Sequence, residues 1–207
     1  MAIKQFSKSN VEGGVRSSKF WDNETYIGDF EWLGTVTISS TSVVSFSFTN
    51  IPQNFTHLQV RSNFRQDGSE NLFACFNTDT DNITPSYNRH YTYHAGNTSG
   101  TGTSGGDTGS LGAGNFGWTP STSAALFTAS GILDIFDYSS TNKWKTTKTQ
   151  LGSAFPNLTP ATTSQGANVF YEGIWWKTDV IRSITMQTDN KAKYFDTGSR
   201  FDLYGWR

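Results

Sequence analysis

The sequence predicts an all-β fold, an antiparallel β-sandwich of two sheets. Three observations lead to this prediction: apolar and polar residues alternate with period two over most of the chain, turn-forming residues separate the alternating runs, and no stretch has a convincing helical period. The composition agrees, because aromatic residues make up 15% of the chain and charged residues only 16%, against about 25% charged in an average chain. A closed barrel is the alternative architecture.

The strands are expected in chain order as follows. An aromatic stretch at 30–33 leads into the first alternating run, which carries Val36 and Ile38. The next two runs alternate at Val44, Phe46 and Phe48, and at Leu58, Val60 and Phe64. Further strands are expected at 72–76, 89–93, 125–138, 144–151, 169–176, 180–188 and 200–206, which gives about ten in all. Turn residues at 50–52, 66–68 and 188–190 separate several of these runs.

The chain divides into an N-terminal arm at 1–20 and one β-sandwich domain at 21–207. Length alone favours a single domain, since 207 residues exceed a typical domain only slightly. The arm has no sustained period and is basic, with Lys4, Lys8, Arg16 and Lys19 against Glu12. Such a segment is either disordered or docks on a partner subunit and becomes ordered there.

A glycine-rich segment at 96–117 holds nine glycines in 22 residues. Because ordering so much backbone freedom is costly, we expect a long surface loop.

Composition excludes several classes of protein. The net charge of −1 and the pI of about 6.3 disfavour a nucleic-acid binder with a broad basic surface. No run approaches 18 apolar residues, so no membrane span is expected.

Cys75 is the only cysteine, which excludes an internal disulfide framework and any zinc site with two or more cysteines. It lies in an apolar run and is expected to be buried and inert, and the chain begins without the apolar region of a secretory signal. The single cysteine and the expected absence of a secretory signal fit synthesis in a reducing cytoplasm.

Two motifs suggest metal sites, but the first fails on distance and the second on residue type. His90 and His94 lie four residues apart, which in a strand separates the rings by roughly 13 Å and prevents one ion from bridging them. The segment that begins at Asn77 has calcium-loop spacing, but Asn82 replaces the required glycine and Asn88 the bidentate glutamate. We expect no metal and no cofactor.

Enzymatic constellations are also weak. Glycoside hydrolysis needs two carboxylates in one cleft. The candidate carboxylates are Asp29, Glu31, Asp134, Asp137 and Glu172, and nothing in the sequence selects a pair. Neither a G-x-S-x-G nucleophile elbow nor a phosphate-binding glycine loop occurs. We therefore do not expect an enzyme.

The surplus of aromatic residues is more informative. Trp175 and Trp176 are adjacent, so in a strand they must point to opposite faces, and one of them should reach a second surface. Such side chains bury in a subunit interface, stack on a sugar ring or pack beneath a loop. The candidate contact residues are Tyr91, Tyr93, Trp118, Trp175 and Trp176.

Several stretches resemble a β-rich domain of tailed-bacteriophage virion proteins, often tail-fibre or other appendage proteins. They are Phe48-Thr-Asn-Ile-Pro52 with Leu58-Gln-Val60, Phe76-Asn-Thr-Asp-Thr80 with Tyr87-Asn88, and Ile132-Leu-Asp-Ile-Phe-Asp-Tyr138 with Lys143-Trp-Lys-Thr-Thr147. The most specific match is the end, Gly198-Ser-Arg-Phe-Asp-Leu-Tyr-Gly205, which looks like the closing strand of that family. The resemblance extends from about Leu33 to the C-terminus.

The resemblance implies a non-enzymatic structural or adhesive protein with a jelly-roll-like sandwich, often a homotrimer. The chain would be made in the host cytoplasm and reside in the virion, where the arm anchors it to other tail or capsid proteins. A tail-fibre or appendage role, with contact to a host surface glycan, is the leading expectation. A capsid decoration protein, a polysaccharide depolymerase and a free carbohydrate-binding module are the alternatives.

Overall fold

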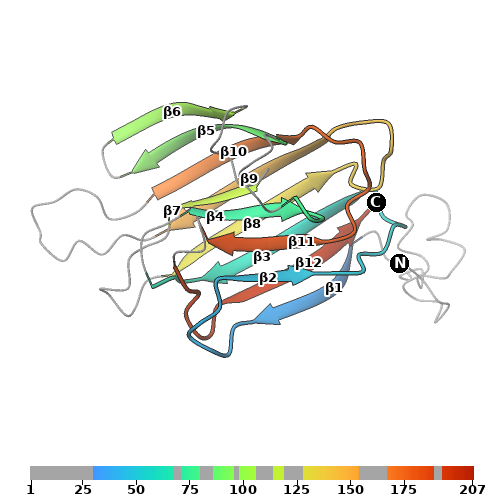
Figure 1. Cartoon of the computed structure of the whole chain (residues 1–207). Coiled ribbons are helices and arrows are strands. Elements are labelled where there is room, and N and C mark those ends of the chain that lie inside the picture. The colour runs from blue at the N-terminus through green and yellow to red at the C-terminus, as the bar shows by residue number, and fades with distance from the viewer. Residues whose placement is uncertain are drawn as a thin grey trace, which may run out of the picture.

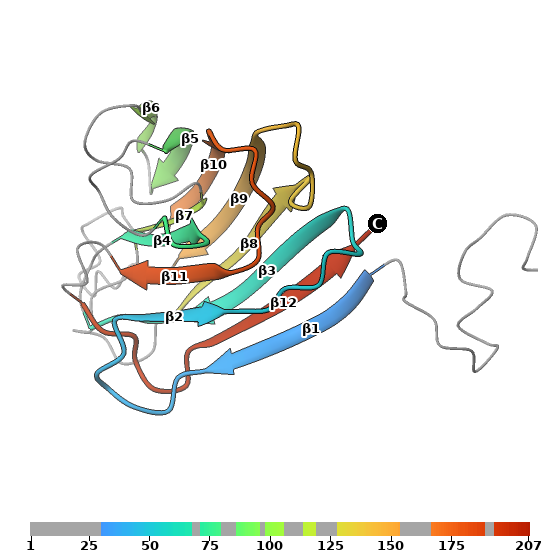
Figure 2. The same cartoon turned by 45° about the vertical axis from the view of Figure 1, so that its right-hand side comes forward.

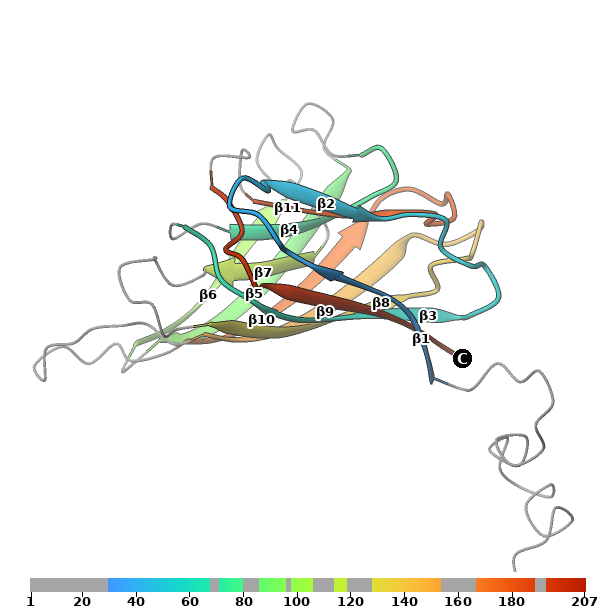
Figure 3. The ribbon, with the colours of Figure 1, turned by 90° about the horizontal axis from the view of Figure 1, so that it is seen from below.

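The β-sandwich predicted from the alternating pattern is confirmed. The computed structural model describes residues 30–67, 71–79, 86–95, 98–105, 114–118, 128–153, 167–188 and 193–207. These residues form strands and turns and no helix, and the strands belong to two antiparallel sheets that pack face to face (Figure 1). Seen from below, the smaller sheet lies as a separate layer above the larger one (Figure 3). The arm at 1–20 lies outside the described residues.

The larger sheet has eight strands in the order β1-β12-β3-β8-β9-β10-β5-β6, and the smaller has four in the order β2-β11-β4-β7. The bounds of β1 to β6 are Phe30–Thr37, Ser45–Phe48, His57–Phe64, Asn71–Phe76, Tyr87–Ala95 and Thr98–Gly105. Those of β7 to β12 are Gly114–Trp118, Ala129–Phe136, Lys145–Ser153, Ala167–Trp175, Ile184–Thr188 and Arg200–Trp206. The described part of the chain contains no helix with the length and hydropathy needed to cross a bilayer.

The core fills the space between the sheets with the apolar positions of the alternating runs. Leu58, Val60 and Phe64 point inward from β3, and Leu133 and Ile135 do so from β8. Residues between them point to the outer face of the larger sheet, as the alternating burial of β8 and β9 shows. Cys75 is buried, as its apolar run predicts.

The prediction of one long loop at 96–117 is wrong over most of its length. Residues Thr98–Gly105 form β6, which pairs with β5 in continuous register, and Gly114–Trp118 form β7. Packing explains the glycine at position 100, where an added Cβ would lie 2.7 Å from a ring carbon of Tyr93. Glycine therefore makes room for an aromatic ring on the neighbouring strand, and the entropic argument for a loop does not hold here.

Most strand bounds differ from the sequence prediction by a few residues, and the run at 180–188 differs more. The run at 180–188 was expected to be a single strand, but only Ile184–Thr188 pair in a sheet. The residues before them form a connection held by Asn77, whose Oδ1 accepts the backbone N–H of Arg182 at 2.8 Å and whose Nδ2 donates to Val180 O at 3.0 Å. Asn77 adopts a positive φ of 55°, a conformation that asparagine tolerates better than most residues.

The closing strand β12 is fixed by the residues that carry the family resemblance. Gly198 has a φ of +90°, which favours glycine, and Ser199 Oγ both accepts from Arg65 N and donates to Arg65 O. Farther along, Gly205 lies against the ring of Phe55, so that an added Cβ would come within 2.6 Å of two ring carbons. The turn and the final glycine therefore have direct structural roles.

A methyl group at residue 205 is expected to destabilise the fold. Gly205→Ala forces the Phe55 ring out of its position, and overpacking of this kind costs about 1–3 kcal/mol of unfolding free energy. The matched control is Gly34→Ala on the neighbouring β1, where an added Cβ has nothing within 4 Å. Urea unfolding should show the loss for Gly205→Ala only, and equal midpoints for the two variants would contradict the packing described here.

The domain has two distinct ends. Phe30, the first residue of β1, pairs with Trp206 of β12, so the chain enters the sandwich and reaches its C-terminus at the same end (Figure 2). Residues 1–29 therefore precede the sandwich at this end, which we call the proximal end. At the opposite end, which we call the distal end, lie the strand ends that flank residues 65–70, 96–97, 119–128, 154–166 and 189–199.

Candidate binding surface

The outer face of the larger sheet carries cross-strand rows whose order follows from the strand register. One row begins with Trp32 and Tyr204 and continues through Gln59 to Asp134. The same row then runs through Lys148, Glu172 and His90. Its aromatic residues lie on β1 and β12, and its remaining members are polar. This row is therefore polar across most of its width and aromatic at the β1 side.

The aromatic side chains gather at the proximal corner of this face. We call this cluster the aromatic corner, and it consists of Phe30, Trp32, His57, Arg61, Phe136, Tyr204 and Trp206. Phe30 stacks on Tyr204 with ring centroids 4.8 Å apart, and the His57 ring lies 5.4 Å from that of Phe136 and 5.2 Å from that of Trp206. These contacts join four strands through their outward side chains.

Arg61 covers part of the corner. Its guanidinium carbon lies 5.0 Å from the ring centre of Phe30 and 5.1 Å from that of Tyr204. Arg61 Nε donates to Gln59 Oε1 at 2.7 Å, and Gln59 Nε2 in turn donates to Asp134 Oδ1 at 2.7 Å. This chain of hydrogen bonds fixes the arginine over the two rings, where cation–π attraction adds to the stacking.

Trp32 is the most exposed aromatic side chain of the corner, with 59% of its surface accessible. Its Nε1 donates to Thr35 Oγ1 at 3.0 Å, and Thr35 Oγ1 donates to Asp202. Arg200 forms a salt bridge with the same carboxylate at 2.9 Å. The indole is therefore held in one orientation although it is exposed.

The pKa of Asp202 reflects this arrangement. Burial on its own raises the pKa of the carboxyl group, but hydrogen bonds from Arg200 and Thr35 and the charges of Arg200 and Arg61 outweigh it, so the pKa is lowered from its ordinary value. Asp202 is therefore ionised at neutral pH. It accepts a hydrogen bond from the Thr35 hydroxyl group, which in turn orients the Trp32 indole.

The five contact residues predicted from the sequence do not form one site. Tyr91 and Tyr93 lie on the inner side of β5, where the Tyr91 ring is 6.4 Å from Tyr93 and 5.4 Å from Tyr171. Trp118 ends β7 opposite Asn71, and its side chain lies outside the described residues. The two remaining tryptophans lie at the proximal end, because β10 ends there.

The expectation that Trp175 and Trp176 face opposite ways is confirmed, and the expectation that Trp175 contacts a partner or glycan is wrong. Trp175 is 1% exposed and Trp176 is 38% exposed. The Trp175 indole stacks beside Tyr87 and donates Nε1 to Asp79 Oδ2 at 2.8 Å. Trp175 is a core residue because this strand position faces the smaller sheet, and only Trp176 is accessible.

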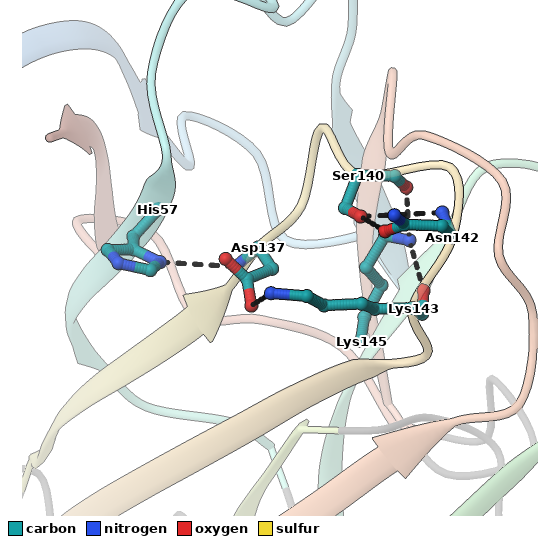
Figure 4. Close-up of polar contacts among 6 residues, drawn as sticks. All are labelled: His57, Asp137, Ser140, Asn142, Lys143 and Lys145. Carbon is teal, nitrogen blue, oxygen red and sulfur yellow. Dashed lines mark hydrogen bonds and ion pairs between the residues drawn. The ribbon is translucent and has the colours of Figure 1, made fainter.

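A polar cluster lies around the connection between β8 and β9 (Figure 4). It contains a histidine, an aspartate and a serine, the residue types of a hydrolytic triad. His57, Asp137 and Ser140 lie in this region, but their hydrogen bonds do not form a relay. His57 Nδ1 accepts the backbone N–H of Asp137 at 3.1 Å, while the Asp137 carboxylate pairs with Lys143 at 3.1 Å. Ser140 Oγ bonds to Asn142 Oδ1 at 2.7 Å. These hydrogen bonds fold the turn.

Lys145 stabilises the same connection from inside. The residue is fully buried, and its Nζ donates to the carbonyl oxygens of Ser140 at 2.7 Å, Lys143 at 2.9 Å and Thr178 at 3.2 Å. Burial lowers the pKa of Lys145 from its ordinary value, and the charges of Asp179 and Asp137 oppose that shift. Because all three ammonium protons are donated to backbone carbonyls, the nitrogen has no role as a nucleophile in this arrangement.

The candidate glycosidase carboxylates that the structure describes do not face one another as a pair. Asp29 lies outside the described residues, Glu31 belongs to β1, and Asp137 pairs with Lys143. Asp134 and Glu172 share a row of the outer face, but Lys148 stands between them in register. No group of three or more metal-ligating side chains occurs among the described residues.

The aromatic corner was missed by the sequence analysis. Phe30 and Trp32 share a face of one strand by parity, as do Tyr204 and Trp206, but the sequence does not say that the first and last strands pair. No family model, no curated protein and no solved structure matches this chain.

Proposed function

We propose that the chain is a non-enzymatic structural component of a tailed-bacteriophage virion. In this proposal it is a tail-fibre or appendage protein that is attached through its N-terminal segment and assembles as a homotrimer. The proposal combines the sequence resemblance described above with the arrangement of the domain.

The observation that carries the proposal is that both chain ends of the sandwich lie at its proximal end. Because Phe30 pairs with Trp206, the N-terminal segment and the C-terminus both meet the sandwich at the proximal end. An attachment through residues 1–20, with Lys4, Lys8, Arg16 and Lys19 as the basic contacts, leaves the distal end directed away from the particle. A domain held at one end and free at the other suits a projecting appendage.

The distal half offers the surface for host contact. Tyr93 of β5 is 38% exposed and lies near the start of the connection across 96–97. Exposed tyrosines stack on sugar rings and also offer a hydroxyl group for hydrogen bonding. In the proposed particle, contact with a host surface glycan takes place at this end.

Immunogold electron microscopy tests the proposal on intact particles. Antibodies raised against the purified chain should label the tail or its appendages on the bacteriophage that encodes the chain. Particles assembled when the chain lacks residues 1–20 should lose the label, because the attachment segment is missing and the chain is not incorporated. Label on the capsid surface would instead identify a decoration protein, and particles without any label would overturn the proposal.

A further inference from the structure

We infer that the connection after β8 and the segment after β10 together form a binding site for a primary ammonium ion, which the chain fills with its own Lys145. We call this site the ammonium cage, and it consists of the carbonyl oxygens of Ser140, Lys143 and Thr178. Figure 4 shows the Lys145 nitrogen beside Ser140 and Lys143. It follows that a free alkylammonium ion binds in the cage once the lysine side chain is removed. The inference does not depend on the proposed function.

The first argument is the geometry of the acceptors. Lys145 Nζ lies 2.7 Å from Ser140 O, 2.9 Å from Lys143 O and 3.2 Å from Thr178 O. An ammonium group has three N–H donors and no acceptor, and the cage supplies an acceptor for each of them. These separations are those of N–H···O hydrogen bonds. They exceed the distances of about 2.3–2.6 Å at which oxygen binds calcium and about 2.0–2.1 Å at which it binds magnesium. The cage therefore fits an ammonium ion and not one of these metal ions.

The second argument is electrostatic, and it selects a cation over a neutral molecule. Lys145 is fully buried, and burial disfavours a charged group. The charges of Asp179 and Asp137 favour the cation, and the cage carbonyls present the negative ends of their dipoles to it. A buried charge is tolerated when it is both hydrogen-bonded and close to opposite charge, and this position meets both conditions.

The third argument is that bonds outside the lysine side chain help to hold the cage together. The N–H of Ser140 donates to Asp137 O at 3.0 Å, which closes the turn after β8. The N–H of Ile181 donates to Tyr138 O at 2.9 Å, which joins the segment that carries Thr178 to this turn. The acceptors therefore stay near one another without the lysine ammonium, and a cation that binds among them can restore their arrangement.

Urea unfolding of the full-length Lys145→Ala chain in n-propylammonium chloride tests the inference. Alanine keeps Cβ, and n-propylammonium supplies the carbon chain and the nitrogen that the substitution removes. The unfolding equilibrium constant of Lys145→Ala should fall about tenfold when the ion is present at ten times its dissociation constant. Isothermal titration calorimetry should show one ion bound per chain of this variant and no binding to the wild-type chain, whose cage is filled.

Two other solutes separate binding in the cage from a general solvent effect. n-Propanol has the same carbon chain without the charge, and potassium chloride has the charge without N–H donors. Neither should shift the unfolding of Lys145→Ala as n-propylammonium does. Equal stabilisation by either solute would overturn the inference.

The matched variant is Lys145→Met, whose side chain occupies the space that alanine leaves open. n-Propylammonium should therefore not stabilise Lys145→Met, and an equal gain for the methionine and alanine variants would contradict binding in the cage. A Lys145→Ala chain that stays unfolded at every concentration of n-propylammonium would overturn the inference too, because the ion then does not replace the side chain. Circular dichroism measures this outcome directly.

Discussion

Replacement of Trp175 by alanine is expected to lower the free energy of unfolding by about 3–5 kcal/mol, the range for removal of a large buried aromatic side chain. The side chain is 1% exposed and its ring packs against those of Tyr87 and Phe76. It also donates a hydrogen bond to Asp79, whose carboxylate is buried and receives a salt bridge from Lys177 at 3.0 Å. Trp175→Ala therefore removes packing and a charge-assisted hydrogen bond together.

Two further variants separate these contributions. Trp176→Ala is the matched control, because the neighbouring indole is 38% exposed and its loss should change stability by less than about 1 kcal/mol. Trp175→Phe retains most of the ring packing but leaves Asp79 without the indole donor, which should cost about 1–3 kcal/mol. Chemical denaturation of the three variants measures all of these values, and similar losses for Trp175→Ala and Trp176→Ala would contradict the placement of the two side chains.

The cost of Trp175→Phe should depend on pH. Burial alone raises the pKa of Asp79, but hydrogen bonds from Trp175, Lys177 and Ser86 and the charge of Lys177 outweigh burial, so the pKa is lowered from 3.8. A carboxyl group with a lowered pKa in the folded state stabilises the fold above its unfolded pKa, and this stabilisation is lost as pH falls through the folded pKa. The difference in stability between wild type and Trp175→Phe should therefore be full near neutral pH and shrink below about pH 3.8.

Replacement of Lys145 by methionine is expected to cost about 3–5 kcal/mol, because three carbonyl oxygens lose their donor and each buried polar group left without a partner costs about 1–3 kcal/mol. Methionine keeps the length of the side chain but cannot donate, so the carbonyl oxygens of Ser140, Lys143 and Thr178 lose their common donor. The connection between β8 and β9 and the segment after β10 should both loosen, which hydrogen exchange of their amides would detect.

Lys143, two residues before Lys145 in the same connection, supplies the control. Lys143 pairs with Asp137 through an ammonium group whose side chain is 61% exposed, and exposed pairs contribute less than about 1 kcal/mol. Lys143→Met should therefore leave the urea midpoint almost unchanged. If Lys143→Met destabilised the protein as much as Lys145→Met, the buried ammonium would not be the group that holds this connection.

Much of the fold could be predicted because inward positions recur with period two. The runs at Leu58, Val60 and Phe64 and at 200–206 became β3 and β12 with the expected faces buried. Failures occurred where a tertiary contact overrides local composition. Gly100 lies in a strand beside Tyr93, whose ring occupies the space that a larger side chain would need. Lys145 is buried because three carbonyl oxygens from two connections surround its ammonium group. Neither contact leaves a signal in the local sequence.

The candidate surface was less predictable than the fold for the same reason. Adjacent tryptophans at 175 and 176 indicate one inward and one outward ring, and this prediction is confirmed. The aromatic corner depends on the pairing of β1 with β12 and of β12 with β3, which brings together residues at opposite ends of the sequence. Parity predicts which residues share a face of one strand, but it does not predict which strands are neighbours.

The central proposal is that the chain is a built-in part of a virus particle, and mass spectrometry of gradient-purified bacteriophage particles tests it most directly. The account predicts peptides of this chain in the particle fraction, at a fixed ratio to the major capsid protein that persists through a second gradient. Recovery of the chain only in the particle-free fraction of the lysate would contradict it.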